Sequence, residues 1–224
     1  MRPNVFTYYS HVPALYSEES QRALIDVWAR SWKKAGWNPV VLSDRYLRHD
    51  PRYPMLKKKF LEHPTEYGDE YTLSCYMRWH AVATQGGGML VDYDVINYGF
   101  APRTPPADRM IIFCDDPPGS IFMGAVLGTR GHFEQMTNIF YNWQIKPEDT
   151  GAQANWWYYN DLMMLERLFH TNHHAKPAWL VKENGCALYD YPSWKNSRLV
   201  HYGYKMHETG HWPKHQHIEK LRPF

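Results

Sequence analysis

The chain has 224 residues, of which 44% are hydrophobic and 21% are charged, so it can form one domain with a sizeable core. Its formal net charge is only +2, and the one tight basic run, residues 57–59, is typical of a solvated face, so a strongly basic nucleic-acid-binding protein is excluded. The three cysteines form no CxxC pair, which argues against a disulfide scaffold and favours a reducing compartment.

Neither a targeting signal nor a membrane span is visible in the sequence. Residues 1–10 contain no apolar core of the kind that signal peptides have. No stretch is long and apolar enough to cross a bilayer. We therefore expect a cytoplasmic protein.

The first 42 residues predict a β-α-β unit. Residues 4–9 form a short β-prone run, and Ser17 has the position of a helix N-cap residue. Helical spacing of apolar residues follows and ends at Gly36. A second strand is predicted over residues 40–42, which is typical of the beginning of a parallel sheet.

The rest of the chain alternates between predicted helices and strands. Residues 45–71 are expected to be loop with a short helix, and a helix from about residue 72 to 85 ends at three glycines. Strands are predicted over residues 89–95, 109–114, 121–127, 178–181, 187–189 and 198–202, and helices over residues 133–143 and 160–169. This order indicates an α/β sandwich around a mostly parallel central sheet.

Asp92 and Asp94 are the most informative pair of residues. On a strand, residues two apart point to the same face, so the two carboxylates would lie side by side near its carboxyl end. They would repel each other unless a cation lay between them. Ligands bind at this edge of open parallel sheets, so the pair predicts a divalent ion whose shell a diphosphate completes. The alternative is two surface carboxylates that bind nothing, since such a spacing also arises by chance.

A longer series of residues surrounds this pair. The series begins with Arg78 and Trp79 on a predicted helix and continues through glycines and an apolar strand to Asp92 and Asp94. It resembles the DXD region of GT-A-fold glycosyltransferases and is similar to families 32 and 8. The resemblance implies a three-layer α/β/α sandwich and Mn²⁺ or Mg²⁺ on the two carboxylates. It also implies that Arg78 reaches the donor sugar or phosphate, as a planar guanidinium suits. A third glycine and Met89 depart from the pattern, and a surface ion pair is the alternative for Arg78.

The same resemblance assigns donor-binding residues near the first two strands. It implies that Thr7, Tyr8 and Asp44 contact the base and ribose of the donor. For Tyr8, core packing is an equally good interpretation. For Asp44, the alternative is a turn cap.

A segment near the C-terminal end, residues 198–205, resembles the H-x-x-G-x-x-K element of retaining GT-A enzymes, with a shorter spacing. This implies that His201 is a third metal ligand and that Gly203 and Lys205 contact the diphosphate. Neutral imidazole and carboxylates together suit Mn²⁺. The alternative for His201 is a buried, hydrogen-bonded histidine.

Asn160 and Asp161 lie where related enzymes have a polar residue at the start of a late helix. Asp161 is thus a predicted general base on the acceptor hydroxyl, or a residue that orients the hydroxyl groups of the donor sugar. A first-turn helix carboxylate is the alternative. A base at Asp161 favours inversion of the anomeric configuration, whereas the His201 element favours retention, so the stereochemistry stays open.

The predicted function is transfer of a sugar from a nucleoside diphosphate sugar, a UDP- or GDP-sugar, to a carbohydrate or other hydroxyl acceptor. Residues 1–205 are the predicted transferase domain, and residues 206–224 a His-rich tail on or near it. One alternative is glycosylation of hydroxymethylated bases in phage-type DNA, with nucleic acid only as the acceptor. The others are a metal-dependent nucleotide or phosphoester hydrolase and a non-catalytic carbohydrate-binding module.

Overall fold

The computed structural model describes residues 2–12, 17–63, 68–114, 124–144, 160–170, 176–189, 193–203 and 214–224. Within these residues the centre of the molecule is a six-stranded sheet of order β2-β1-β3-β6-β5-β7. The strands are β1 (Asn4–Tyr8), β2 (Asn38–Leu42), β3 (Gly87–Val91), β5 (Met110–Phe113), β6 (Ala125–Thr129) and β7 (Leu180–Glu183). Only β6 runs antiparallel to its neighbours, so the predicted mostly parallel sheet is confirmed.

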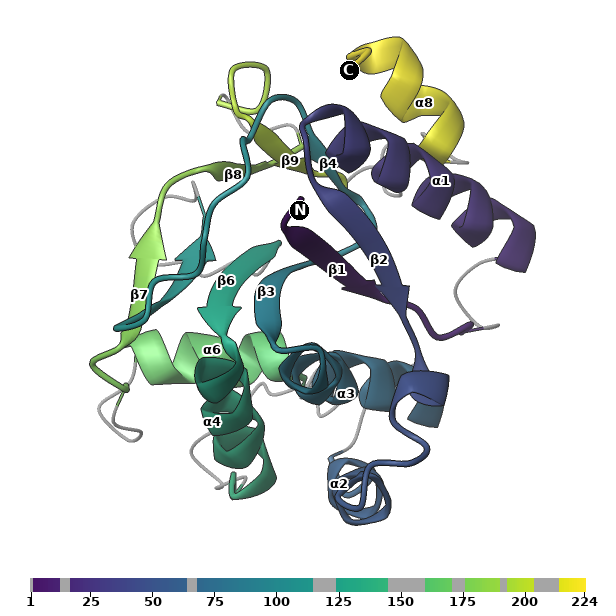
Figure 1. Cartoon of the computed structure of the whole chain (residues 1–224). Coiled ribbons are helices and arrows are strands. Elements are labelled where there is room, and N and C mark those ends of the chain that lie inside the picture. Colours follow the sequence, from purple (N-terminus) through teal and green to yellow (C-terminus); the bar gives the residue numbers. More distant parts are fainter. Residues whose placement is uncertain are drawn as a thin grey trace, which may run out of the picture.

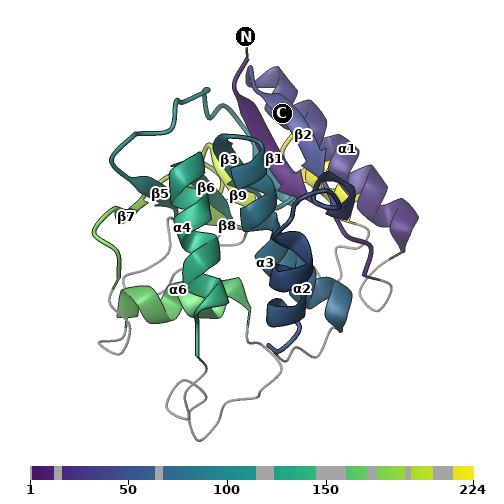
Figure 2. The same ribbon diagram turned by 60° about the horizontal axis from the view of Figure 1, so that its bottom comes forward.

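Helices cover both faces of this sheet. The helices are α1 (Glu18–Lys34), α2 (Tyr53–Phe60), α3 (Asp69–Thr84), α4 (Arg130–Tyr141), α6 (Asp161–His170) and α8 (Lys214–Leu221), with a 3-10 turn η1 (Asp44–Tyr46). Helices α1 and α8 lie on one side of the sheet, and α2, α3, α4 and α6 on the other (Figures 1 and 2). The predicted three-layer α/β/α arrangement is therefore confirmed. No helix in the described segments is both long enough and apolar enough to span a bilayer.

The sheet buries residues on both faces because its strands alternate between two hydrophobic clusters. In β3, Met89 and Val91 pack in the cluster on the side of α1, and Leu90 packs in the cluster on the side of α3. Ile111 and Ile112 of β5 divide in the same way. This is the two-residue period of a strand covered on both faces, and it explains why the strands read as continuous apolar runs.

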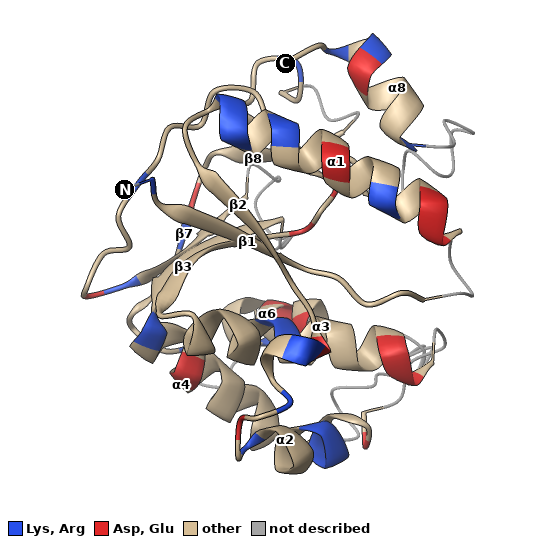
Figure 3. Cartoon of the chain, turned by 45° about the vertical axis from the view of Figure 1, so that its right-hand side comes forward, with Lys and Arg blue, Asp and Glu red and all other residues tan. Residues whose placement is uncertain are grey.

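Helix α1 forms as its local sequence predicts. The Ser17 hydroxyl accepts a hydrogen bond from the Ser20 amide at 3.2 Å, so it is the N-cap. Acidic residues lie in the first turn and lysines in the last, which complements the helix dipole (Figure 3). The buried Trp32 indole donates to the Val95 carbonyl at 2.9 Å. Through this bond α1 holds the segment that follows β3.

The prediction of one strand over residues 89–95 is wrong. Strand β3 ends at Val91, and a turn closed by the Val95 amide and the Asp92 carbonyl at 3.0 Å leads into β4 (Val95–Asn97). Strand β4 belongs to a second sheet with β9 (Leu199–His201) and β8 (Cys186–Leu188). Val95 is buried although it belongs to β4, so the alternation of apolar residues continues through the turn. The sequence pattern therefore does not show that the strand ends at Val91.

The C-terminal segment contains a docked helix. Helix α8 lies against α1, with Ile218 fully buried and Glu219 paired with Arg30 at 2.7 Å. Its first residue, Lys214, is only 5% exposed. The described part of the predicted tail therefore packs on the domain, whereas a division of the chain at residue 205 stays a prediction.

The glycine run at the start of β3 gives a test of strand pairing. A Cβ atom at Gly87, where φ is +86°, would lie 2.4 Å from the Arg130 nitrogen, whereas one at Gly86, φ +93°, would meet nothing within 4 Å. We expect Gly86→Ala to cost about 1–2 kcal/mol of unfolding free energy through backbone strain. Gly87→Ala should cost at least about 2 kcal/mol more, because β3 must also move away from β6. Urea denaturation measures both, and equal losses would contradict the expectation.

Candidate functional site

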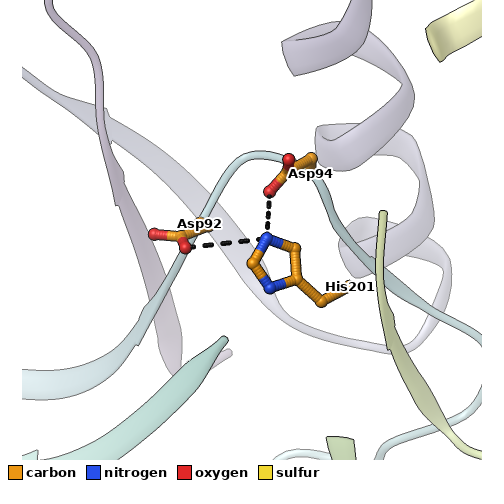
Figure 4. Close-up of side chains that lie close together, drawn as sticks. All are labelled: Asp92, Asp94 and His201. Atoms are coloured by element: carbon orange, nitrogen blue, oxygen red, sulfur yellow. Dashed lines mark ion pairs between the residues drawn. The ribbon is translucent and has the colours of Figure 1, made fainter. Parts of the chain in front are cut away.

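Asp92, Asp94 and His201 converge at the end of β3. The two aspartates lie on the turn between β3 and β4, and His201 ends β9. Strand pairing brings them together, because His201 is in register with Val95 and the Tyr202 amide donates to the Asp94 carbonyl at 2.9 Å. The His201 Nε2 atom lies 2.9 Å from Asp94 Oδ1 and 3.8 Å from Asp92 Oδ2 (Figure 4). One ligand atom from each residue lies within 4.8 Å of the others.

Each aspartate has one oxygen bonded to a basic side chain and the other directed at His201. Arg78 donates from Nη1 to Asp92 Oδ1, and Lys214 Nζ donates to Asp94 Oδ2 at 2.7 Å. The oxygens that face His201 are Asp92 Oδ2 and Asp94 Oδ1. The basic partners therefore fix the two carboxylates so that each presents a single oxygen to the cluster.

The residues present fit a divalent metal ion. Carboxylate oxygens with one imidazole nitrogen are a ligand set that Mn²⁺ accepts, and Mg²⁺ accepts the oxygens. Space beside the imidazole depends on Gly203, since a Cβ atom there would lie 3.2 Å from His201 Nε2. The predicted donor-site residue Gly203 is thus adjacent to the predicted metal ligand. Lys205 lies outside the described residues.

Arg78 joins the candidate metal ligands to Asp161. Asp161 Oδ2 accepts from Arg78 Nη2 at 2.7 Å, from Arg78 Nε at 2.8 Å and from Trp79 Nε1 at 2.6 Å. The other oxygen accepts from the Leu162 amide at 3.1 Å, and the side chain is 1% exposed. Asn160 caps α6, with its Oδ1 accepting from the Met163 amide at 3.2 Å. The structure thus brings Asp161 into the site as the anchor of Arg78. The catalytic roles of Asp161 and Asn160 stay predictions.

The electrostatics of the two aspartates differ. Burial raises the pKa of Asp92 above its ordinary value, although Arg78 and His201 act in the opposite direction. Burial also acts to raise the pKa of Asp94, but His201 and Lys214 together outweigh it and lower that pKa. For Arg78, burial favours the neutral form, and the carboxylates of Asp161 and Asp92 more than compensate, so its pKa is raised. Asp94 is therefore ionised and Arg78 charged at neutral pH.

Tyr8 and Asp44 form a second group at the same edge of the sheet. The Tyr8 hydroxyl donates to Asp44 Oδ1, and the Tyr53 hydroxyl donates to Oδ2 at 2.8 Å. Burial, followed by this bond, raises the pKa of Tyr53 to about 12. Thr7 is 1% exposed on β1. Strands β2, β1 and β3 are adjacent and parallel, so this group follows their carboxyl ends, as Asp92 does.

Two residues of the site were not predicted. Tyr53 lies in the segment expected to be loop with a short helix, where a tyrosine has no motif to mark it. Lys214 is 120 residues from its partner Asp94, in a stretch that its histidines dominate. No spacing rule connects such a lysine with a DXD pair, so only the folded chain shows the contact.

The fold and the site together define an α/β protein with a glycosyltransferase-like fold. The chain is similar to a solved structure described as a glycosyltransferase involved in the glycosylation of the major capsid of PBCV-1, with a TM-score of 0.55 and 12% identity, over 95% of this chain and 100% of that chain. At this identity the likeness establishes the fold. A search of the curated proteins finds no match. The chain belongs to the family described as "Domain of unknown function (DUF8765)", whose model matches residues 1–113.

Proposed function

We propose that the protein is a metal-dependent glycosyltransferase that transfers a sugar from a nucleoside diphosphate sugar to a hydroxyl group of a carbohydrate or other acceptor. The observation that carries the proposal is the convergence of Asp92, Asp94 and His201 beyond β3. The glycosyltransferase-like fold supports it, because ligands of open α/β sheets bind at the carboxyl ends of the strands. A UDP- or GDP-sugar is the proposed donor.

In this proposal the side chains of the site have different roles. Asp92, Asp94 and His201 would hold Mn²⁺ or Mg²⁺, which when bound neutralises the charge that develops on the leaving diphosphate. Arg78 fixes Asp92 and contributes a positive charge beside the same diphosphate. Thr7, Tyr8 and Asp44 would contact the nucleoside, and Gly203 and Lys205 the phosphates.

Two roles are open for Asp161. As the predicted general base it would accept a proton from the acceptor hydroxyl, and it would have to give up one of its present donors to do so. As a positioning residue it would hold Arg78 and the α6 end in place, which its four hydrogen bonds already do. The second role is better supported by the contacts, and Asn160 would assist it by capping α6.

A thermal-shift screen tests the proposal. The protein is heated with UDP-, GDP- and TDP-sugars, each with and without Mn²⁺. A donor present at 100 times its Kd should raise Tm by about 5 °C or more, because binding stabilises only the folded state. The shift should require the metal.

The controls separate the rival functions. A phosphoester hydrolase would degrade a plain nucleoside diphosphate as readily as a sugar nucleotide, and a carbohydrate-binding module would show no metal-dependent nucleotide binding. Either result, or the absence of a metal-dependent shift for every donor, contradicts the proposed transfer. Hydroxymethylated duplex DNA enters the follow-up assay only as an acceptor, where salt-sensitive binding would favour it.

A further inference from the structure

Lys214 is a buried positive charge that reaches the candidate metal centre from the last helix. Its side chain is 6% exposed, and its Nζ lies 2.7 Å from Asp94 Oδ2. An ammonium group is seldom buried unless a charge pairs with it, so the position of Lys214 depends on Asp94.

The rest of the C-terminal segment holds Lys214 in place. Ile218 of α8 is fully buried, and Glu219 of α8 pairs with Arg30 of α1. Beyond the helix, Arg222 Nη1 donates to the carbonyls of Trp194 and Ser197, each at 2.9 Å. Lys214 is therefore the first residue of an anchored element.

The contact of Lys214 involves only one oxygen of Asp94 and leaves the other directed at His201. Lys214 bonds Oδ2, whereas Oδ1 is the oxygen that lies 2.9 Å from His201 Nε2. The ammonium can thus remain on its oxygen while the other oxygen binds an ion. Lys214 acts on such an ion through charge.

The charges of the described residues around the centre nearly cancel. Three carboxylates, those of Asp92, Asp94 and Asp161, are paired with two basic side chains, Arg78 and Lys214. With His201 neutral, the group carries a formal charge of −1, which a divalent ion would convert to +1. Without Lys214 the same group would carry −2 and an ion would neutralise it fully.

We propose that Lys214 is a positioning residue that couples metal binding to diphosphate binding. It lowers the affinity of the centre for the free ion and leaves a positive charge that only an anionic ligand balances. The ion and the diphosphate therefore bind well together and poorly apart. This inference rests on the proposed function, because it assumes that the centre takes a divalent ion and a diphosphate.

The test compares the wild-type protein with Lys214→Met, which keeps an unbranched side chain only one atom shorter and removes its charge. Mn²⁺ binding is followed by electron paramagnetic resonance, alone and with UDP or GDP. The variant should bind free Mn²⁺ about tenfold more tightly, as expected for the loss of one nearby positive charge. The increase in Mn²⁺ affinity that nucleotide causes should shrink by a similar factor. Lys220→Met, on the exposed part of the same helix, should behave as wild type, and Lys214→Arg should retain the coupling.

Unchanged or weaker binding of free Mn²⁺ by Lys214→Met would overturn the inference and leave the proposed function intact. If neither protein binds Mn²⁺, with or without nucleotide, both fail. If only the variant binds Mn²⁺, and the wild type binds none even with nucleotide, Lys214 excludes the ion and does not couple it to the diphosphate, so the inference fails together with the metal dependence of the wild type. Near-ultraviolet circular dichroism checks that the variant is folded, and Lys214→Gln replaces it if it is not.

Discussion

Replacing Asp94 with asparagine is expected to abolish metal-dependent donor binding and to lower kcat/KM for glycosyl transfer by about a thousandfold, the upper range for losing one electrostatic contact to the transition state. Asparagine keeps the shape of the side chain but removes the charge that both His201 and Lys214 face. The centre then keeps the positive charge of Lys214 but loses the negative charge of Asp94, so it attracts an incoming cation less. The measurement is a Mn²⁺ titration of transfer activity with the donor found in the thermal-shift screen.

The control for this variant is Asp26→Asn, which changes an exposed aspartate of α1 and should leave both binding and transfer unchanged. Asp94→Asn also removes the carboxylate charge that pairs with the buried Lys214 ammonium, so the variant should melt at a lower temperature. Assays are therefore run below the melting transition of the variant. Transfer that still responds to Mn²⁺ within tenfold of wild type would contradict the role given to Asp94.

The local features of the fold could be predicted because short-range signals specify them. Ser17 and Gly36 mark the two ends of α1, and apolar runs mark the central strands. The break after Val91 was missed, because a buried valine at residue 95 continues the alternation into a different sheet. Its pairing partner is β9, more than 100 residues away, and no pattern in either segment announces that contact.

The candidate site was predictable only in part. Asp92 and Asp94 were selected by their spacing, and they do converge, although a turn and a strand pairing bring this about rather than the pleat of one strand. His201 was selected through its resemblance to a family motif. Asp161 is predicted to be a general base or a residue that orients the donor sugar, and these roles stay predictions; in the structure its carboxylate pairs with Arg78. Lys214 could not be selected, because a single ion pair across 120 residues leaves no periodicity or motif in the sequence.

Removal of Arg78 is expected to produce the largest loss of stability among the site residues. Arg78→Met leaves the almost fully buried Asp161 and the neighbouring Asp92 without their common cation. Breaking a buried pair in this way costs about 3–5 kcal/mol of unfolding free energy, because an uncompensated charge stays inside the protein. Urea denaturation provides the measurement. Arg22→Met, which removes an exposed ion pair on α1, should change the stability little.

The double variant Arg78→Met with Asp161→Asn shows whether charge is the cause. The two donors Trp79 and Leu162 bond different oxygens of Asp161, so asparagine can keep only one of these two hydrogen bonds. Asparagine carries no charge and needs no cation, however, so the double variant should be about 1–3 kcal/mol more stable than the two single losses added together would give. If the two losses simply add, Arg78 stabilises the fold through its contacts with the chain and not through Asp161. Restored stability should not restore activity, because Asp92 then lacks the guanidinium that directs its second oxygen toward His201.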